Sequence, residues 1–225
     1  ITTKVLETMA FSVGTRNRDT VTLGGSDTHG PCDAIQVVNN NRLNLGNPNA
    51  EYSLETSTAW DVYSYWRLSS NSSGGATVYY SGNTLANTVG DEIAEMGPAA
   101  TTSLPGAPQF GLGFVDATTD DETPTDKFDP AFKTLVAGVD DRFKMPTLDV
   151  LTPAAAYANG TGAINGTPTA TFAFEKSSNT VPKVIAEDTD DVISCDTAKM
   201  RYVANIGADT PAGVYTTKIN YLAAP

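Results

Sequence analysis

The chain has very little of the side-chain chemistry on which hydrolases and metal sites depend. Its 225 residues include one histidine, His29, and two cysteines. Serine- and cysteine-based catalysis needs a histidine held by an orienting partner, and His29 lies in Gly24–Pro31, a stretch typical of a loop. Histidine clusters and four-cysteine zinc sites are excluded by count. We therefore expect no catalytic residues, no metal site, no cofactor and no enzymatic activity.

Charge is also scarce, and most of it is negative. Charged residues make up 18% of the chain, and 14 basic residues stand against 26 acidic ones, for a net charge of −12. Phosphate backbones and anionic lipid surfaces attract clustered lysine and arginine, so we expect neither a nucleic acid nor a membrane surface as partner. The uncharged stretch Val150–Phe174 is interrupted by prolines and glycines, so no membrane span is expected in the mature chain.

Acidic residues gather in three short runs, at 120–122, 140–141 and 187–191. Calcium prefers clustered oxygen ligands, but none of these runs has the mid-loop glycine and closing glutamate of an EF-hand loop. Solvated acidic loops are the favoured interpretation, and calcium binding is the alternative.

The two cysteines, Cys32 and Cys195, lie far apart in the sequence. An isolated pair suits a disulfide in an oxidising compartment, where closing so long a loop would stabilise the fold by roughly 5 kcal/mol before strain. The alternative is two unpaired buried thiols. The chain begins at Ile1 rather than at methionine, and we expect a mature form from which an export signal has been removed.

Short alternating segments separated by turn residues dominate the chain. From Trp60 to Leu68 the even positions are mostly apolar, and Asn71–Gly75 is typical of a hairpin loop. Further strands are expected at 34–38, 76–81, 109–115, 170–175, 192–195, 199–206 and 213–222, with short helical segments at 91–96 and 128–138. The pattern predicts one all-β domain over residues 1–225, an antiparallel β-sandwich of the immunoglobulin-like or jelly-roll-like kind, with long decorated loops and at most short helices.

Two sets of residues are candidates for interaction with carbohydrate, one by binding it and the other by carrying it as an attached glycan. Aromatic residues that could form a sugar-stacking platform are Trp60, Tyr63, Tyr65, Trp66, Tyr79 and Tyr80. The favoured alternative is that the tryptophans belong to the core and the tyrosines cover the other face of the sheet or a neighbouring subunit. Asn71, Asn159 and Asn165 each begin an N-glycosylation acceptor pattern, a short pattern that also arises by chance.

The first thirteen residues alternate from the start of the chain. Ile1, Val5, Met9, Phe11 and Val13 share one parity, with Thr3 and Glu7 between them. A free terminus usually frays, so an apolar one must dock, either in its own sheet or in that of another molecule. Residues 1–13 are therefore a candidate donor strand, and these five apolar residues are the candidate subunit-assembly face.

The C-terminal stretch Met200–Tyr221, with a Pro211-Ala212-Gly213 turn before Tyr215-Thr216-Thr217, resembles the closing strands of exported β-sandwich surface proteins of small-genome candidate-phylum bacteria. Segments similar to Met9–Val13, Ala59–Tyr65 and Pro108–Leu112 occur in these proteins in the same order, and the resemblance covers about a third of the chain. The Gly213–Thr216 ending is also similar to that of secreted pilins assembled by donor-strand exchange. The chain lacks the long apolar N-terminal helix of type IV pilins, and its cysteine spacing differs from that of chaperone–usher subunits.

This resemblance implies a structural subunit of an extracellular filament or pilus at the cell surface. Copies of the chain would then form a homopolymer in which the N-terminal strand of one subunit completes the sheet of the next. Two other functions stay open: a carbohydrate-binding or adhesin module that recognises surface glycans, and a subunit of a two-dimensional surface layer.

Overall fold

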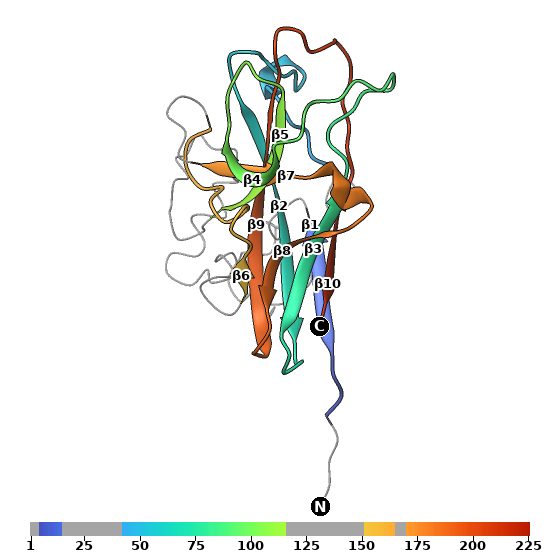
Figure 1. Ribbon diagram of the computed structural model, residues 1–225, viewed down its shortest axis with the longest axis vertical. Helices are drawn as coiled ribbons and strands as arrows, with labels where there is room; N and C mark the ends of the chain where they lie inside the picture. Colours follow the sequence, from blue (N-terminus) through green and yellow to red (C-terminus); the bar gives the residue numbers. More distant parts are fainter. Residues whose placement is uncertain (1–4, 15–41, 116–150, 165–169) are drawn as a thin grey trace, which may run out of the picture.

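The computed structural model describes residues 5–14, 42–115, 151–164 and 170–225. In these ranges ten strands form two antiparallel sheets that pack face to face (Figure 1). The six-stranded sheet has the order β1 (Met9–Gly14), β2 (Trp60–Ser70), β9 (Ile193–Asn205), β5 (Gln109–Val115), β7 (Thr171–Phe174), β4 (Gly97–Thr102). The four-stranded sheet has the order β10 (Ile219–Ala224), β3 (Ala76–Gly82), β8 (Lys183–Asp188), β6 (Thr152–Pro153). The predicted all-β sandwich is confirmed.

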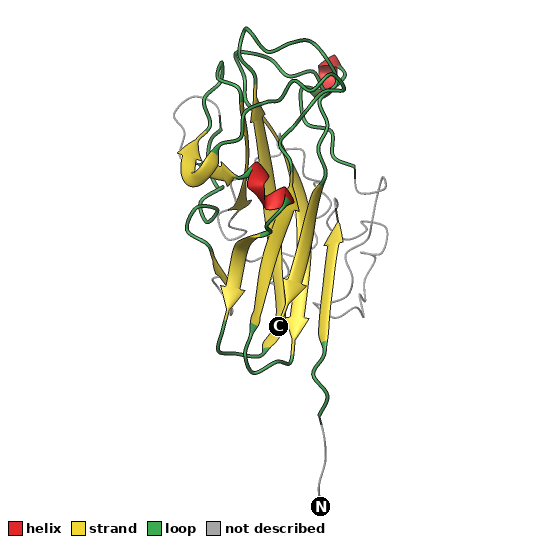
Figure 2. Ribbon diagram, turned by 45° about the vertical axis from the view of Figure 1, so that its right-hand side comes forward, coloured by secondary structure: helices red, strands yellow, loops and turns green. Residues whose placement is uncertain are grey.

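The helices of the described chain are two short 3₁₀ turns, η3 (Pro48–Ala50) and η6 (Lys176–Asn179), as Figure 2 shows. The helical segment expected at 91–96 is wrong, because the backbone amide of Ile93 donates to Leu85 across the loop and that of Asn87 donates to Asp91. The strand expected at 213–222 begins only at Ile219, and before it Thr216 makes a single bridge with Ala86. The segments 34–38 and 128–138 lie outside the described residues.

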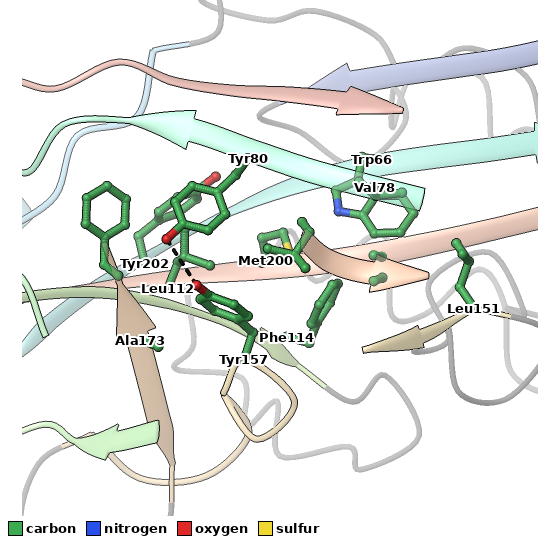
Figure 3. Packing of buried hydrophobic residues seen from close by; sticks show 14 of the residues in the cluster. Trp66, Val78, Tyr80, Leu112, Phe114, Leu151, Tyr157, Ala173, Met200 and Tyr202 are labelled. Carbon is green, nitrogen blue, oxygen red and sulfur yellow. Dashed lines mark hydrogen bonds between the residues drawn. The ribbon is translucent and has the colours of Figure 1, made fainter. Parts of the chain in front are cut away.

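The core lies between the two sheets (Figure 3). Trp66 and Leu68 of β2 are fully buried, which confirms that the even positions of this strand face inward. The Trp66 and Phe114 rings meet edge to face with their centroids 6.0 Å apart. From the other sheet, the Tyr80 ring lies 5.4 Å from the Phe174 ring of β7, measured between centroids, so aromatic side chains join the two layers.

The six-stranded sheet is covered on its outer face as well. A second, smaller cluster of buried side chains lies there, made of Ala59, Ile164, Ala170, Phe172 and Val203. On the same side Tyr65 and Arg67 are buried. The odd positions of β2 are therefore not a solvent face along this stretch.

The long strands β2, β3 and β9 run nearly parallel to the long axis of the molecule, whereas β7 runs across it (Figure 1). Several of the connections lie at the two ends of this axis. At one end, here called the loop end, lie η3 and the connections 83–96, 103–108 and 206–218. At the opposite end, here called the tail end, lie the β2–β3 turn, the β8–β9 turn and the segment 5–8 that precedes β1. At this end Gly75 has φ +74, and a Cβ there would meet the backbone oxygen of Asp188 at 2.1 Å, so the expected hairpin loop needs its glycine.

Candidate functional site

The candidate donor strand is an edge strand of the six-stranded sheet. β1 pairs antiparallel with β2 in an unbroken register from Met9 opposite Ser70 to Gly14 opposite Tyr65. The described part of residues 1–13 therefore docks, from Met9 onward, on a strand of its own chain. Ile1 lies outside the described residues.

The alternation expected for this strand is present. Met9, Phe11 and Val13 are partly buried and pack against the core, whereas Ala10 between them is exposed. The Phe11 ring packs against the core, with its centroid 6.0 Å from that of Trp66. Val5, the fourth apolar residue of this parity in the described chain, is 81% exposed, so the structure brings three of the five predicted assembly residues together.

The segment preceding β1 is held by one residue of the β2–β3 turn, Asn71. Its side chain accepts a hydrogen bond from the Thr8 amide (2.6 Å) and donates one to the Leu6 carbonyl (2.8 Å). Its own backbone amide donates to the Thr8 carbonyl (3.1 Å). Asn71 thus continues the β1–β2 ladder by one step after β2 has turned away. Sequence analysis identified this residue as part of a hairpin loop and as a glycosylation acceptor. Its contacts with Leu6 and Thr8 lie too far away in sequence for a local pattern to indicate.

A small cavity of about 170 Å³ lies where β1 ends, between the two sheets. Its apolar walls include Val13, Val62 and Ile219. Three hydroxyl groups in its lining form a hydrogen-bonded chain: the Tyr202 hydroxyl oxygen lies 2.8 Å from that of Ser64 and 2.5 Å from that of Tyr221. Burial raises the pKa of both phenols, so they stay neutral hydrogen-bonding groups. A cavity of this volume holds one benzene-sized group, too little for an added strand.

The six aromatic residues considered as a sugar platform do not share a surface. Trp66 and Tyr80 are fully buried in the core. Tyr63 lies on the outer face of the six-stranded sheet, under the Lys199 ammonium at 4.4 Å, whereas Tyr79 lies on β3 of the other sheet. Trp60 is partly buried and Tyr65 is buried. Trp66 therefore belongs to the core as expected, whereas Trp60 is in neither buried cluster of the described chain and Tyr80, expected outside the core, lies within it.

Sequence analysis missed a buried charged group with several hydrogen bonds, Arg201 on β9. Its Nε donates to the Asp61 carboxylate (2.8 Å), and its Nη1 donates to the carbonyls of Gly160 (3.0 Å) and Gly162 (2.7 Å). These hydrogen bonds attach the 151–164 segment to the outer face of the sheet. The guanidinium is occupied by its own chain, which is a structural arrangement rather than a binding site.

The structure describes only some of the residues predicted for glycosylation, a disulfide or calcium binding. Asn159 is exposed, and Asn165 and Cys32 lie outside the described residues; of Cys195 only the backbone, within β9, is described. The acidic run 187–191 lies at the β8–β9 turn, where the Asp191 amide donates to the Asp188 carboxylate. The described ranges contain no group of three or more histidine, cysteine, aspartate or glutamate residues placed to hold a metal ion. Nor does any helix in them have the length and apolar character needed to cross a membrane.

Comparison with known proteins gives no match to this chain among family models, curated proteins or solved structures.

Proposed function

We propose that this protein is a structural subunit of an extracellular filament or pilus, in which each copy donates its N-terminal strand to the neighbouring copy. The observation that carries the proposal is the position of β1. It is the first strand of the described chain, it lies at an edge, and its apolar face docks on a sheet of the core. A strand in this position can leave without disturbing the order of the other strands.

Every copy presents the same acceptor. In all copies the edge of β2 that receives β1 is identical. So are the Trp66 ring beside Phe11 and the Asn71 side chain that binds Leu6 and Thr8, here called the Asn71 clamp. A β1 strand that leaves its own sheet can therefore form the same hydrogen bonds and the same apolar packing on a neighbour. Such exchange between copies is a low-cost route to assembly, and a head-to-tail contact that does not close on itself grows into a filament.

The length of the chain permits the exchange. Residues 15–41 separate β1 from the rest of the described fold, and a peptide of that length reaches roughly 90 Å when extended. Backbone pairing supplies affinity in strand addition, and alternate side chains supply specificity. In β1 those side chains are Met9, Phe11 and Val13.

A reversible disulfide tests the exchange directly. Ala10 and Ser69 face each other in the β1–β2 register, so Ala10→Cys with Ser69→Cys can link the two strands. Oxidised as a monomer, the double variant should stay monomeric and polymerise only after reduction. Oxidised after assembly, it should run as a ladder of linked chains on a denaturing gel.

Each single-cysteine variant serves as control, because it cannot form this bridge and reports any bridging through Cys32 or Cys195. Assembly of the monomer-locked protein at the wild-type rate would refute strand donation. So would oxidised filaments that yield only single chains under denaturing conditions.

A further inference from the structure

The large apolar side chains that the described chain exposes gather at its two ends. On the segments of the loop end these are Tyr52, Val89, Leu104 and Val214. On those of the tail end they are Val5, Leu6 and Val192. Only Val181 and Leu222 of this set lie elsewhere. Exposed apolar groups that are concentrated rather than scattered indicate an interaction surface.

Two of these residues project from neighbouring loops. Val89 is 82% exposed and Val214 is 79% exposed. Their loops are held together by paired backbone hydrogen bonds between Ala86 and Thr216, of 3.1 and 2.9 Å. Close by, a Cβ on Gly213 would lie 3.4 Å from the Asn87 side chain. Val89 and Val214, here called the loop-end valines, thus lie on loops that contact each other.

Both loops are fixed from within. The Asn87 side chain accepts hydrogen bonds from the amides of Val89 (3.1 Å) and Asp91 (2.8 Å), and it donates to the Asp91 carboxylate (2.8 Å). In the second loop the Tyr215 hydroxyl donates to the Pro211 carbonyl (2.8 Å). The two valines are therefore presented by ordered turns, which reduces the entropy lost when a partner covers them.

The direction of β1 indicates which partner this is. Gly14, the last residue of β1, lies toward the loop end, and the segment 5–8 lies at the tail end (Figure 1). In a polymer formed by strand donation, the chain therefore leaves an acceptor toward its loop end and continues there into the body of the donor copy. At the tail end of each copy, the β1 docked there is preceded by two exposed apolar side chains, Val5 and Leu6, which are 81% and 65% exposed.

We propose that the loop-end valines of one copy pack, at the tail end of the next copy, against Val5 and Leu6 of the donated strand that is docked there, as an axial contact along the filament. This inference rests on the proposed filament and adds a second contact to the exchanged strand. The two surfaces are different, so the contact is heterologous and repeats in one direction. Its role is to hold successive copies in line.

Charged substitutions with a matched control test the contact. Val89→Asp and Val214→Asp place a carboxylate in the loop-end patch, and Leu6→Asp places one in the tail-end patch. The control is Val181→Asp, because Val181 is 61% exposed and lies between η6 and β8, away from both patches. Each patch variant should raise the critical concentration for assembly at least tenfold, and the control should change it less than twofold.

Critical concentrations are measured by sedimentation of preformed filaments after dilution, with thermal melting of each monomer to verify folding. Unchanged critical concentrations in the patch variants would overturn the axial contact, as would an equal effect of Val181→Asp. The Ala10→Cys and Ser69→Cys bridge, added to each patch variant at high concentration, reports strand exchange separately. Linked chains with a raised critical concentration support both contacts, whereas a wild-type protein that never sediments overturns both.

Discussion

β1 and β9 pair with opposite edges of the same strand, β2, but they are held very differently. β9 is continuous over thirteen residues, pairs with β2 on one side and β5 on the other, and buries Ala198 and Met200 completely. β1 has six residues and one described strand neighbour, and its apolar side chains are only partly buried. β9 is thus part of the core, whereas β1 is attached to the outside edge of β2. Strands of the second kind open at low free energy, which strand donation requires.

Removing a core side chain that supports both strands should lower the stability of the protein the most. Trp66→Ala removes a fully buried ring that contacts Phe114 and Phe11, and we expect it to lower the free energy of unfolding by about 3–5 kcal/mol. Chemical denaturation of the monomer measures this. A loss below about 1 kcal/mol would mean that the core does not depend on this ring.

High pH should weaken the core next. Burial is the main cause that raises the pKa of Tyr80 and Tyr157, whose hydroxyls lie 3.1 Å apart. These phenols ionise near pH 10 only in the unfolded chain. Their stabilising contribution is therefore complete below pH 10 and is lost above it, by up to about 1.4 kcal/mol per phenol and pH unit. Unfolding and tyrosinate absorbance should appear together, and Tyr157→Phe should make the decline shallower; phenols that titrate at pH 10 in the folded protein would contradict this.

The attachment of β1 should respond to a milder change. Phe11→Ala removes a partly buried side chain, and we expect it to weaken strand docking by about 1–2 kcal/mol. Amide hydrogen exchange should then accelerate roughly tenfold in β1 and remain unchanged in β9. Equal acceleration in the two strands would show that β1 opens only with the whole domain.

The smallest change concerns the clamp at the tail end. Asn71→Ala removes the hydrogen bonds to Thr8 and Leu6, each worth about 0.5–1.5 kcal/mol or less at an exposed site, and should speed exchange of the Thr8 amide. Asn71→Asp keeps the acceptor for Thr8 but loses the donor to Leu6, so its effect should be intermediate. Ser72→Ala, in the same turn, is the control and should leave the Thr8 amide unchanged.

Sequence patterns predicted the sandwich because period-two alternation is a local signal that burial enforces. Trp66 faces the core, and the turn at Asn71–Gly75 lies where its composition indicated. The Asn71 clamp and the Arg201 hydrogen bonds could not be predicted, since both join segments brought together only by the sheet order. The same limit applies to Tyr65 and Arg67, whose burial on the outer face of the six-stranded sheet alternation along β2 does not predict.

High-resolution electron cryomicroscopy of the native, undenatured protein tests strand donation most directly. We expect filaments with a regular axial repeat, in which Met9–Gly14 of each copy lies on β2 of its neighbour. Dispersed monomers, or filaments in which every β1 stays on its own β2, would contradict it.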